Sequence, residues 1–296
     1  MTTPQFIHLR MHSEFSVSEG ITRIDEALAT AHADGQAALA LTDLNNTFGL
    51  IKFYKAAQSL GVKPIMGAEI LLANIDDAAA PYRLLLLVKN HGGYLRLCEL
   101  LSRAYMREER LWHGQIDAAW LDDAAANVGL IALSGAHLGD VGHALLKGQQ
   151  ALALKLAQQW SAAFNGAYYL EVQRLDTPES EQQTLLAAQL AADAQIALVA
   201  THAIQFLAPD DHRAHEARVC ISQGEILSNP QRLAAFSPCQ YLMTQAEMAA
   251  RFSDLPSALH NSVAIAQACN LLLDLGKPQL PDYPTPNGES LDEYMA

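Results

Sequence analysis

The sequence contains few cysteines, and none of them stands in a metal-binding or redox motif. Its 296 residues include four, with no CxxC pair among Cys98, Cys220, Cys239 and Cys269. This spacing predicts free thiols in a reducing compartment, so we expect a cytoplasmic protein. The chain also lacks any run of about 20 apolar residues, so neither a transmembrane helix nor a membrane partner is expected. Its first residues show no basic segment followed by an apolar one, which argues against export.

Positive charge is also scarce. Nineteen Lys and Arg residues against 32 Asp and Glu residues give a formal net charge of −13, and no basic run exceeds two residues. A protein that grips a nucleic-acid backbone normally presents a basic stripe, so tight binding of duplex DNA by this chain alone is not expected. A protein partner, or a small phosphate held by metal, fits this charge better.

Half of the residues are hydrophobic and 17% are charged, which is typical of a globular fold. Short apolar segments alternate with Ala-rich amphipathic segments up to about residue 200. The expected strands are 6–9, 38–41, 64–72, 83–88, 129–133, 168–172 and 196–200. The expected helices are 24–33, 49–60, 94–106, 141–163 with a break at Gly148, and 179–192. This alternation predicts βαβ units and a parallel sheet that is covered on both faces.

The seven strands fit either an open doubly wound sheet or a closed barrel. Most of them end in chemically capable residues, namely His8 to His12, Thr42 and Asp43, Glu69, Ser134 to His137, Glu171 to Gln173, and Thr201 and His202. An open sheet would place a site on fewer of its strands, so the pattern favours a barrel with its site at one mouth. The alternative is that these polar residues only mark where the strands stop.

The pattern changes to helices after residue 208. One helix is expected over 209–222, a capping box at Thr244 and Glu247 opens a second, and Pro256 begins a third. The segment 277–288 contains four prolines, which is typical of an extended linker. We therefore expect a domain over 1–275, followed by a Pro-rich linker over 276–296 that leads to a further part of a longer protein.

The first strand carries alternating polar residues. His8, Arg10 and His12 share one face, because alternate residues of a strand point the same way. Two imidazoles on one face could bind a metal ion, but the fixed charge of Arg10 lies between them. By itself this pattern is weak evidence for a metal site.

Three successive segments, 6–16, 40–54 and 61–69, resemble one family in order and in content. It is the polymerase-and-histidinol-phosphatase (PHP) domain that begins the bacterial DNA polymerase III alpha subunit. Further similar segments follow at 93–105, 131–135, 169–173 and 199–201, so the resemblance covers nearly the whole chain. It implies an α/β fold, a distorted seven-stranded (β/α) barrel of the PHP type, followed by short C-terminal helices and the linker.

The resemblance also implies where a metal site would lie. Metal-competent members hold up to three ions at the barrel mouth and hydrolyse phosphoesters there. The ligand-type residues at or beside these positions in this chain are His12, Glu19, Asp43, Glu69 and His202. The positions that depart from the family pattern are Arg10, Leu44, Arg83, Ala136, Ala203 and Gln205.

These departures favour a catalytically degenerate mouth. A hydrolytic zinc site needs about three protein ligands and an open position, and fixed arginines oppose a cation. We expect Arg10 and Arg83 to pair with Glu19, Asp43 and Glu69, with no cofactor bound. The alternative is a residual site for Zn, Mn or Mg on His12, Glu69 and His202.

The resemblance implies a scaffold function. The domain would dock the proofreading exonuclease subunit and support the polymerase, with the rest of the replicative holoenzyme as further partner. DNA would be reached only indirectly through the full-length polymerase, whose nucleotidyl-transfer carboxylates would follow residue 296, so this chain itself should not polymerise DNA. As an isolated domain we expect a monomer. The alternative is a metal-dependent phosphoesterase, pyrophosphatase or 3′–5′ exonuclease at the barrel mouth.

Overall fold

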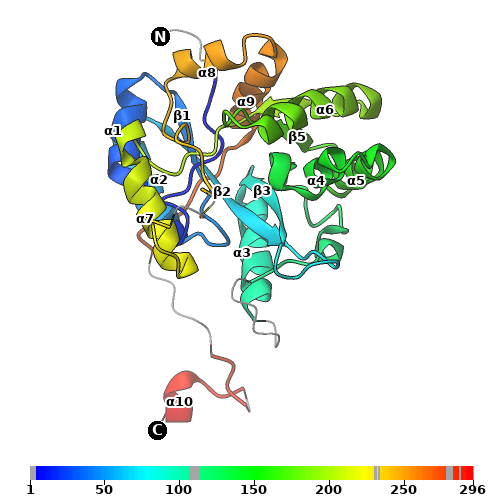
Figure 1. Ribbon diagram of the computed structural model, residues 1–296. Coiled ribbons are helices and arrows are strands. Elements are labelled where there is room, and N and C mark those ends of the chain that lie inside the picture. The colour runs from blue at the N-terminus through cyan, green and yellow to red at the C-terminus, as the bar shows by residue number, and fades with distance from the viewer. Residues whose placement is uncertain are drawn as a thin grey trace.

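The computed structural model describes residues 5–106, 114–229, 232, 234–277, 283–286 and 288–295. In this part of the chain a curled six-stranded sheet forms the centre of an α/β fold, with its strands in chain order (Figure 1). The strands are β1 (Ala38–Leu41), β2 (Lys63–Leu72), β3 (Tyr82–Val88), β4 (Leu130–Leu133), β5 (Tyr168–Val172) and β6 (Leu198–Ala200). The six strands agree with six of the seven predicted segments.

The expectation of a wholly parallel sheet is wrong at β3. This strand runs antiparallel to both β2 and β4, whereas the other neighbouring strands are parallel. The reason is the connection 73–81, which contains no helix and lets the chain turn back directly. As a consequence, the N-terminal end of β3 lies beside the C-terminal ends of its neighbours.

The segment 6–13 was expected to begin with a strand, but it forms only isolated bridges. His8 pairs with Leu39 and Met11 pairs with Ile204, so this segment lies between the two edges of the curled sheet. Three of its backbone N–H groups donate to side chains and not to a neighbouring strand. They are Ile7 N to Ser262 Oγ at 3.0 Å, Met11 N to Thr42 Oγ1 at 2.9 Å and Ser13 N to Asp43 Oδ1 at 2.6 Å. These side-chain acceptors interrupt the ladder that a regular strand would need.

The helices follow the predicted pattern closely. They are α1 (Ile24–Ala33), α2 (Leu50–Leu60), α3 (His91–Tyr105), α4 (Asp140–Leu146), α5 (Gln150–Ala163), α6 (Pro178–Ala194), α7 (His212–Gln223), α8 (Gln245–Arg251), α9 (Pro256–Ala268) and α10 (Leu291–Met295). Short 3₁₀ helices cover Glu14–Ser16, Ala118–Leu121, Ala136–Leu138 and Pro209–Asp211. Gly148 has a φ of +73° and separates α4 from α5, as predicted. The capping box is also confirmed, because Thr244 N donates to Glu247 Oε2 at 2.7 Å and Glu247 N donates to Thr244 Oγ1 at 3.2 Å.

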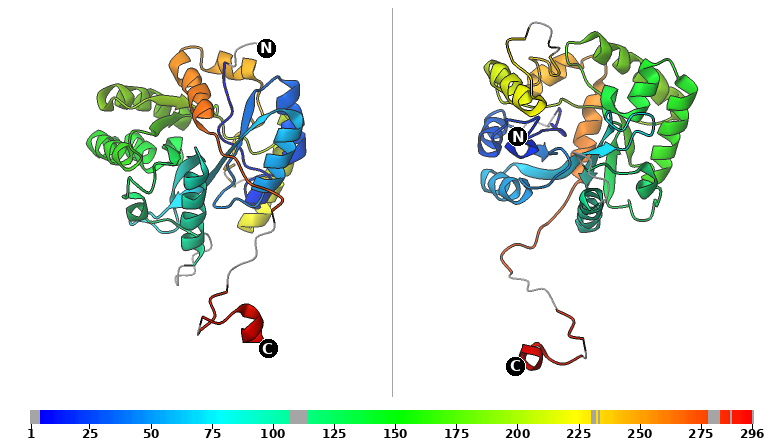
Figure 2. Two further views of the ribbon diagram at one scale, coloured as in Figure 1. Left: turned by 180° about the vertical axis from the view of Figure 1, so that it is seen from behind. Right: turned by 60° about the horizontal axis from the view of Figure 1, so that its bottom comes forward.

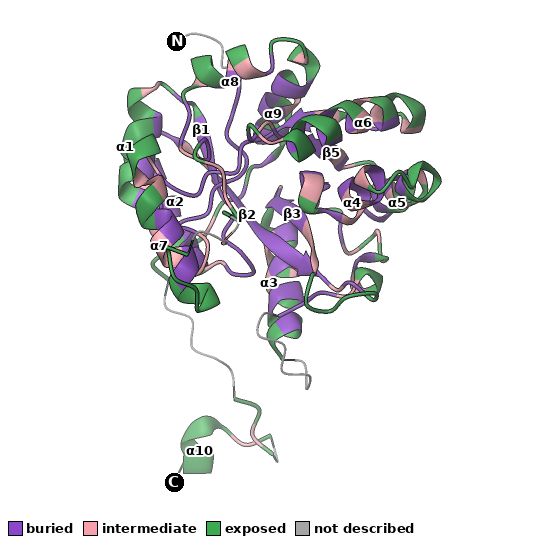
Figure 3. Cartoon of the chain, viewed as in Figure 1, coloured by how far each residue is buried: buried purple, intermediate pink, exposed green. Residues whose placement is uncertain are grey.

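The two faces of the sheet pack against different helices. Leu84, Leu86 and Val88 of β3 join the cluster formed with α1 to α6, whereas Leu85 and Leu87 join an inner cluster with α9. In the right-hand view of Figure 2, α9 lies at the centre of the ring of elements. Figure 3 shows that most residues of the strands are buried, and consecutive residues of a strand point to opposite faces of the sheet. No helix in the described ranges is long and apolar enough to cross a membrane.

The end of the chain lies apart from the rest in Figures 1 and 2. In this stretch, Tyr283 and Tyr294 contact each other with ring centroids 5.8 Å apart. The centre of the predicted linker, 278–282, and Asn287 lie outside the described residues. The domain boundary at residue 275 therefore stays a prediction.

Candidate functional site

The candidate site lies at the mouth of the curled sheet, where the two-residue period of the strands presents charged residues to the interior. In β2 and β3, Glu69 and Arg83 are in step with inner-cluster residues such as Ile65 and Leu85. In β5, Glu171 alternates with outward residues in the same way. Because alternate residues share a face, these three side chains converge above the inner core.

Arg10 is the centre of this group. Its Nη1 donates to Glu171 Oε1 at 3.1 Å and to Oε2 at 3.2 Å, and its Nη2 donates to Glu69 Oε1. Arg10 is 3% exposed and both glutamates are fully buried. Burial lowers the pKa of Arg10, but the two carboxylates outweigh this effect and raise it above its ordinary value.

Arg83 links Glu19 to Glu69 in the same group. Its two terminal nitrogens hold Glu19 at 2.7 and 2.6 Å, and its Nη1 also donates to Glu69 Oε2 at 3.3 Å. Burial raises the pKa of Glu19, but the Arg83 guanidinium more than offsets this and lowers it. A bidentate pair of this kind fixes both side chains in orientation as well as charge.

His12 contacts the same carboxylates. Its Nε2 lies 2.6 Å from Glu69 Oε2, and its Nδ1 lies 3.9 Å from Glu19 Oε2. Glu69 is thus shared by Arg10, His12 and Arg83. Burial raises the pKa of Glu69, but these neighbours, Arg10 first, hold it well below its ordinary value.

Glu171 also belongs to this group, although its sequence position identified it only as a polar residue near the end of a strand. Its carboxylate accepts hydrogen bonds from Gln173 Nε2 at 3.0 Å, from Gly135 N at 2.9 Å and from the Thr201 hydroxyl, besides those from Arg10. One feature of the sequence could have identified Glu171 as a member of the group: it is the only acidic residue in the apolar segment 168–172. A buried carboxylate needs a partner, so this position implies a paired cation or hydrogen-bond donor. We call Arg10, His12, Glu19, Glu69, Arg83 and Glu171 the mouth cluster.

Asp43 lies beside the mouth cluster but does not pair with its arginines, contrary to expectation. Its carboxylate accepts hydrogen bonds from Ser13 N at 2.6 Å, from Ser13 Oγ at 2.8 Å and from Ser16 Oγ at 2.7 Å. Burial raises the pKa of Asp43, and the serine hydrogen bonds partly offset the rise. These bonds tie the loop after the first segment to the end of β1.

His202 was expected beside His12 and Glu69, but the structure places its ring elsewhere. Its Nε2 lies 2.8 Å from Cys239 O, and its ring centroid lies 6.2 Å from that of His8, whose Nε2 lies 2.7 Å from Met243 O. Burial lowers the pKa of His202 to about 3 and that of His8 to about 4. Both imidazoles are therefore neutral in the folded protein at pH 7.

The positions that depart from the family pattern surround the mouth. Leu44 is buried and forms a bridge with Glu69, and Ala136 is buried with a φ of +50°. Ala203 and Gln205 line a cavity of about 270 Å³ together with Arg10 and Arg83. Among the described residues, no group of three or more His, Cys, Asp or Glu side chains is arranged to hold a metal ion.

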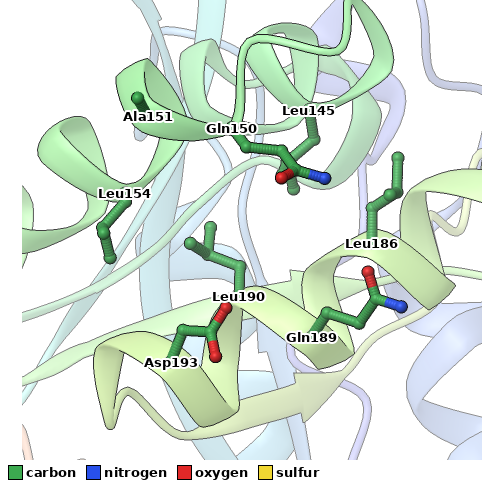
Figure 4. Close-up of a pocket in the computed structure, with 8 residues that line it drawn as sticks. All are labelled: Leu145, Gln150, Ala151, Leu154, Leu186, Gln189, Leu190 and Asp193. Atoms are coloured by element: carbon green, nitrogen blue, oxygen red, sulfur yellow. The ribbon is translucent and has the colours of Figure 1, made fainter.

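The mouth cavity is lined by more neutral polar and apolar groups than charged ones. Its other lining residues are Glu19, His137, Leu138, Gln173, Leu175, Gln223, Ala235, Phe236 and Gln240. A smaller cavity of about 210 Å³ lies between the α4–α5 region and α6, where Leu154 and Leu190 face each other (Figure 4). Both are smaller than the ligand pockets of roughly 300–1,000 Å³ that are common in proteins.

Comparison with known proteins places this geometry in a family context. A family model described as "PHP domain" matches residues 8–175, more than half of the chain. The DNA polymerase III subunit alpha of Neisseria meningitidis serogroup A is 46% identical over 297 residues, covering 100% of this chain and 26% of that protein. The corresponding subunit of Pseudomonas aeruginosa is 44% identical over 293 residues, covering 99% of this chain and 25% of that one.

The chain thus spans about a quarter of the length of these curated relatives. Among solved structures, an amidohydrolase from Chromobacterium violaceum has a TM-score of 0.48 and 17% identity, covering 72% of this chain and 96% of that one.

Proposed function

The chain belongs to the PHP domain family, and we propose that it is a metal-free, catalytically degenerate scaffold domain of a DNA polymerase III alpha subunit. In this role it docks the proofreading exonuclease subunit, supports the polymerase and acts in the cytoplasm within the replicative holoenzyme. DNA is then contacted only through the full-length polymerase. We also propose that residues 6–13 take the place of the seventh strand of the family's barrel.

The hydrogen bonding of the three glutamates of the mouth cluster carries the metal-free part of this proposal. Each carboxylate oxygen of Glu19, Glu69 and Glu171 contacts at least one donor from the protein. A metal ion at Glu69 would have to displace Arg10 or Arg83, and these cations cannot lose their charge near neutral pH. Such an exchange would leave buried charges unpaired, which is costly.

The residual hydrolytic site is not favoured by the geometry. It requires His202 beside His12 and Glu69, but His202 Nε2 is engaged with Cys239 O, and His202 does not line the mouth cavity. A hydrolytic site needs about three protein ligands around an open position.

Metal analysis tests the metal-free proposal. The 296-residue chain would be incubated with Zn²⁺ or Mn²⁺, desalted and measured by plasma mass spectrometry, with turnover of a phosphodiester assayed in parallel. We expect far less than one ion per chain and no turnover above the buffer blank. Near-stoichiometric metal together with turnover would contradict the proposal.

Exposed apolar side chains beside the mouth support the docking role. Val17, Phe48 and Ile221 are 65%, 72% and 83% exposed. Their segments are joined by hydrogen bonds, because Arg218 of α7 donates to Val17 O and Asn46 Nδ2 donates to Phe15 O at 3.0 Å. Apolar residues that gather at the surface are typical of protein interfaces, and the acidic chain favours a protein partner over DNA.

Co-elution tests the docking role. The chain would be mixed with the exonuclease subunit of the same bacterium and passed over a gel-filtration column. We expect a complex, which the substitutions Phe48→Glu and Ile221→Glu weaken. Leu185→Glu on α6, an equally exposed position at 67%, serves as the matched control and should leave the complex intact. Failure of the unmodified chain to co-elute would count against docking.

A further inference from the structure

A third cavity lies away from the mouth cluster, between the connection 73–81 and the helices α4 and α5. Its volume is about 430 Å³, which falls within the usual range for ligand pockets. It is lined by Leu72, Ala73, Asn74, Ile75, Asp76, Tyr82, Ala118, Asp140, His143, Ala144, Lys147, Gln149, Leu152, Leu156 and Trp160. We call it the flank cavity.

The helical wall of the flank cavity combines apolar side chains such as Leu156 and Trp160 with polar ones, and contacts within the protein hold its aromatic groups in place. Trp160 is only 5% exposed, and its Nε1 donates to Asp140 Oδ2 at 2.8 Å. His143 of α4 packs edge-on against Tyr82 of β3, with ring centroids 5.5 Å apart and an interplanar angle of 67°. Because these aromatic groups are already held by the protein, a ligand would meet a formed surface and need not order it.

The opposite wall, formed by the connection 73–81, is also held by hydrogen bonds. Asn74 Nδ2 donates to Ala80 O at 2.9 Å, and Asn74 Oδ1 accepts from Asp76 N at 3.1 Å. Gln115 Nε2 further donates to Ala78 O at 2.9 Å. These bonds hold the connection 73–81 open, while Ile75 at its rim is fully exposed.

The charge around the flank cavity is asymmetric. Lys147 is exposed at the end of α4 and forms no ion pair within the part of the chain that the structure describes. The carboxylate of Asp140 is engaged by Trp160 and by Val141 N at 2.7 Å. These two donors are neutral, so Asp140 keeps its negative charge at the N-terminal end of α4, whereas Lys147 lies at the C-terminal end. Asp76 lies on the opposite wall. An anionic group is therefore favoured beside Lys147 and disfavoured near Asp140 and Asp76.

The rim extends the apolar surface beyond the cavity itself. Ile75 on one side and Leu152 on the other are both exposed, at 101% and 44%. A small metabolite enclosed in the cavity would leave these two side chains in water. A polypeptide that crosses the rim would cover both and bury additional apolar area.

From these observations we propose that the flank cavity binds a peptide segment of a partner protein that carries a bulky apolar side chain next to a carboxylate. The apolar side chain packs against Trp160 and Leu156, and the carboxylate lies beside Lys147. This surface is separate from Val17, Phe48 and Ile221, so the inference does not depend on exonuclease docking.

Two model peptides provide the test on the full 296-residue chain. The acidic probe is acetyl-Phe-Leu-Asp-amide, and its neutral twin is acetyl-Phe-Leu-Asn-amide. Binding is followed through the indole N–H resonance of Trp160, which is assigned by its loss in Trp160→Phe. We expect a saturable shift with the acidic probe and at least about threefold weaker binding of the twin, the size of an exposed charge contact.

Three variants complete the test. Lys147→Glu should lower the affinity for the acidic probe by about tenfold, because it reverses the charge at the contact. Lys155→Glu is the matched control, since it makes the same exchange on α5 at an exposed residue outside the cavity lining, and it should change the affinity less than twofold. Ala118→Trp fills the cavity from an exposed position and should abolish binding of both probes.

Four results would contradict the proposal. Equal affinity for the two probes, or equal effects of Lys147→Glu and Lys155→Glu, would overturn the role of the carboxylate. An unshifted Trp160 resonance at millimolar probe, or binding that survives Ala118→Trp, would overturn the site itself. Thermal unfolding of each variant confirms that the fold is retained, which is expected because the substituted lysines and Ala118 are exposed.

Discussion

The mouth cluster and the histidine pair, His8 and His202, bury polar groups in opposite ways. In the mouth cluster, Arg10 keeps its charge because Glu69 and Glu171 contact it directly. Among the described residues, no carboxylate contacts the ring of His8 or His202 directly, and burial instead removes their charge by lowering the pKa of each imidazole. A nearby opposite charge, and not burial alone, therefore decides which of these groups stay ionised.

Among the substitutions that test this comparison, replacing Arg10 should lower the free energy of unfolding the most. Arg10→Met leaves Glu69 and Glu171 buried with fewer cationic partners, and we expect a loss of about 3–5 kcal/mol in the free energy of unfolding. Arg10→Lys keeps the charge but not the two-pronged geometry, so it should lose less. Urea unfolding at pH 7 measures both. A loss below about 1 kcal/mol for Arg10→Met would show that the pairing adds little.

Neutralising Glu69 should cost less than removing Arg10. In Glu69→Gln, Arg10 still contacts Glu171 and Arg83 still contacts Glu19, so no cation is left alone. We expect a loss of about 1–3 kcal/mol, the usual cost of an imperfectly satisfied buried group. The same urea experiment tests this order. A larger loss of stability in Glu69→Gln than in Arg10→Met would contradict the pairing of Arg10 with both Glu69 and Glu171.

The histidine pair should appear in the pH dependence of stability. The pKa of His8 falls from an ordinary 6.5 to about 4 on folding. The neutral form therefore stabilises the fold above pH 6.5, and this contribution is lost as the pH falls from 6.5 towards 4, where only the unfolded chain binds the proton. Each such histidine steepens the loss by up to about 1.4 kcal/mol per pH unit.

His8→Gln isolates this contribution, since glutamine can still donate to Met243 O. We expect the slope of unfolding free energy between pH 6 and pH 5 to become shallower by about 1 kcal/mol per pH unit. Carboxylates with a lowered pKa, such as Glu69, lose their contribution only below about pH 4.5, so they do not disturb this window. An unchanged slope in His8→Gln would mean that the buried ring is charged.

The smallest effect is expected at an exposed ion pair. Lys52 Nζ lies 3.2 Å from Glu14 Oε1 and 3.2 Å from Asp25 Oδ2, and its side chain is 38% exposed. Lys52→Met should change the free energy of unfolding by less than about 1 kcal/mol, and the change should shrink in high salt. A salt-independent loss as large as that of Arg10→Met would remove the distinction between buried and exposed pairs.

Local signals in the sequence predicted the helices well, because caps and glycines act within a few residues. Thr244 with Glu247, Pro256 and Gly148 each mark a boundary that the structure contains. The direction of β3 was not predictable in the same way. It depends on how the connection 73–81 turns back, and an apolar run such as 84–88 reads identically in either direction.

The candidate site was predicted in part. Arg10, Arg83, Glu19 and Glu69 meet as expected. Strand alternation brings Glu69 and Arg83 to one face, whereas Arg10 and Glu19 reach them from segments outside the strands. Asp43 is instead held by serines 27 and 30 residues earlier in the chain. The ring of His202 faces Cys239 O, a contact set by the long segment that follows α7. Such long-range packing has no signature in residue type or spacing.

A crystal structure of the chain grown with Zn²⁺ or Mn²⁺ tests the metal-free mouth most directly, with anomalous data collected at the absorption edge of the added metal. We expect no anomalous peak in the mouth, and we expect the Arg10 guanidinium to lie between Glu69 and Glu171. A strong peak coordinated by His12 and Glu69, with Arg10 or Arg83 displaced, would overturn the metal-free proposal.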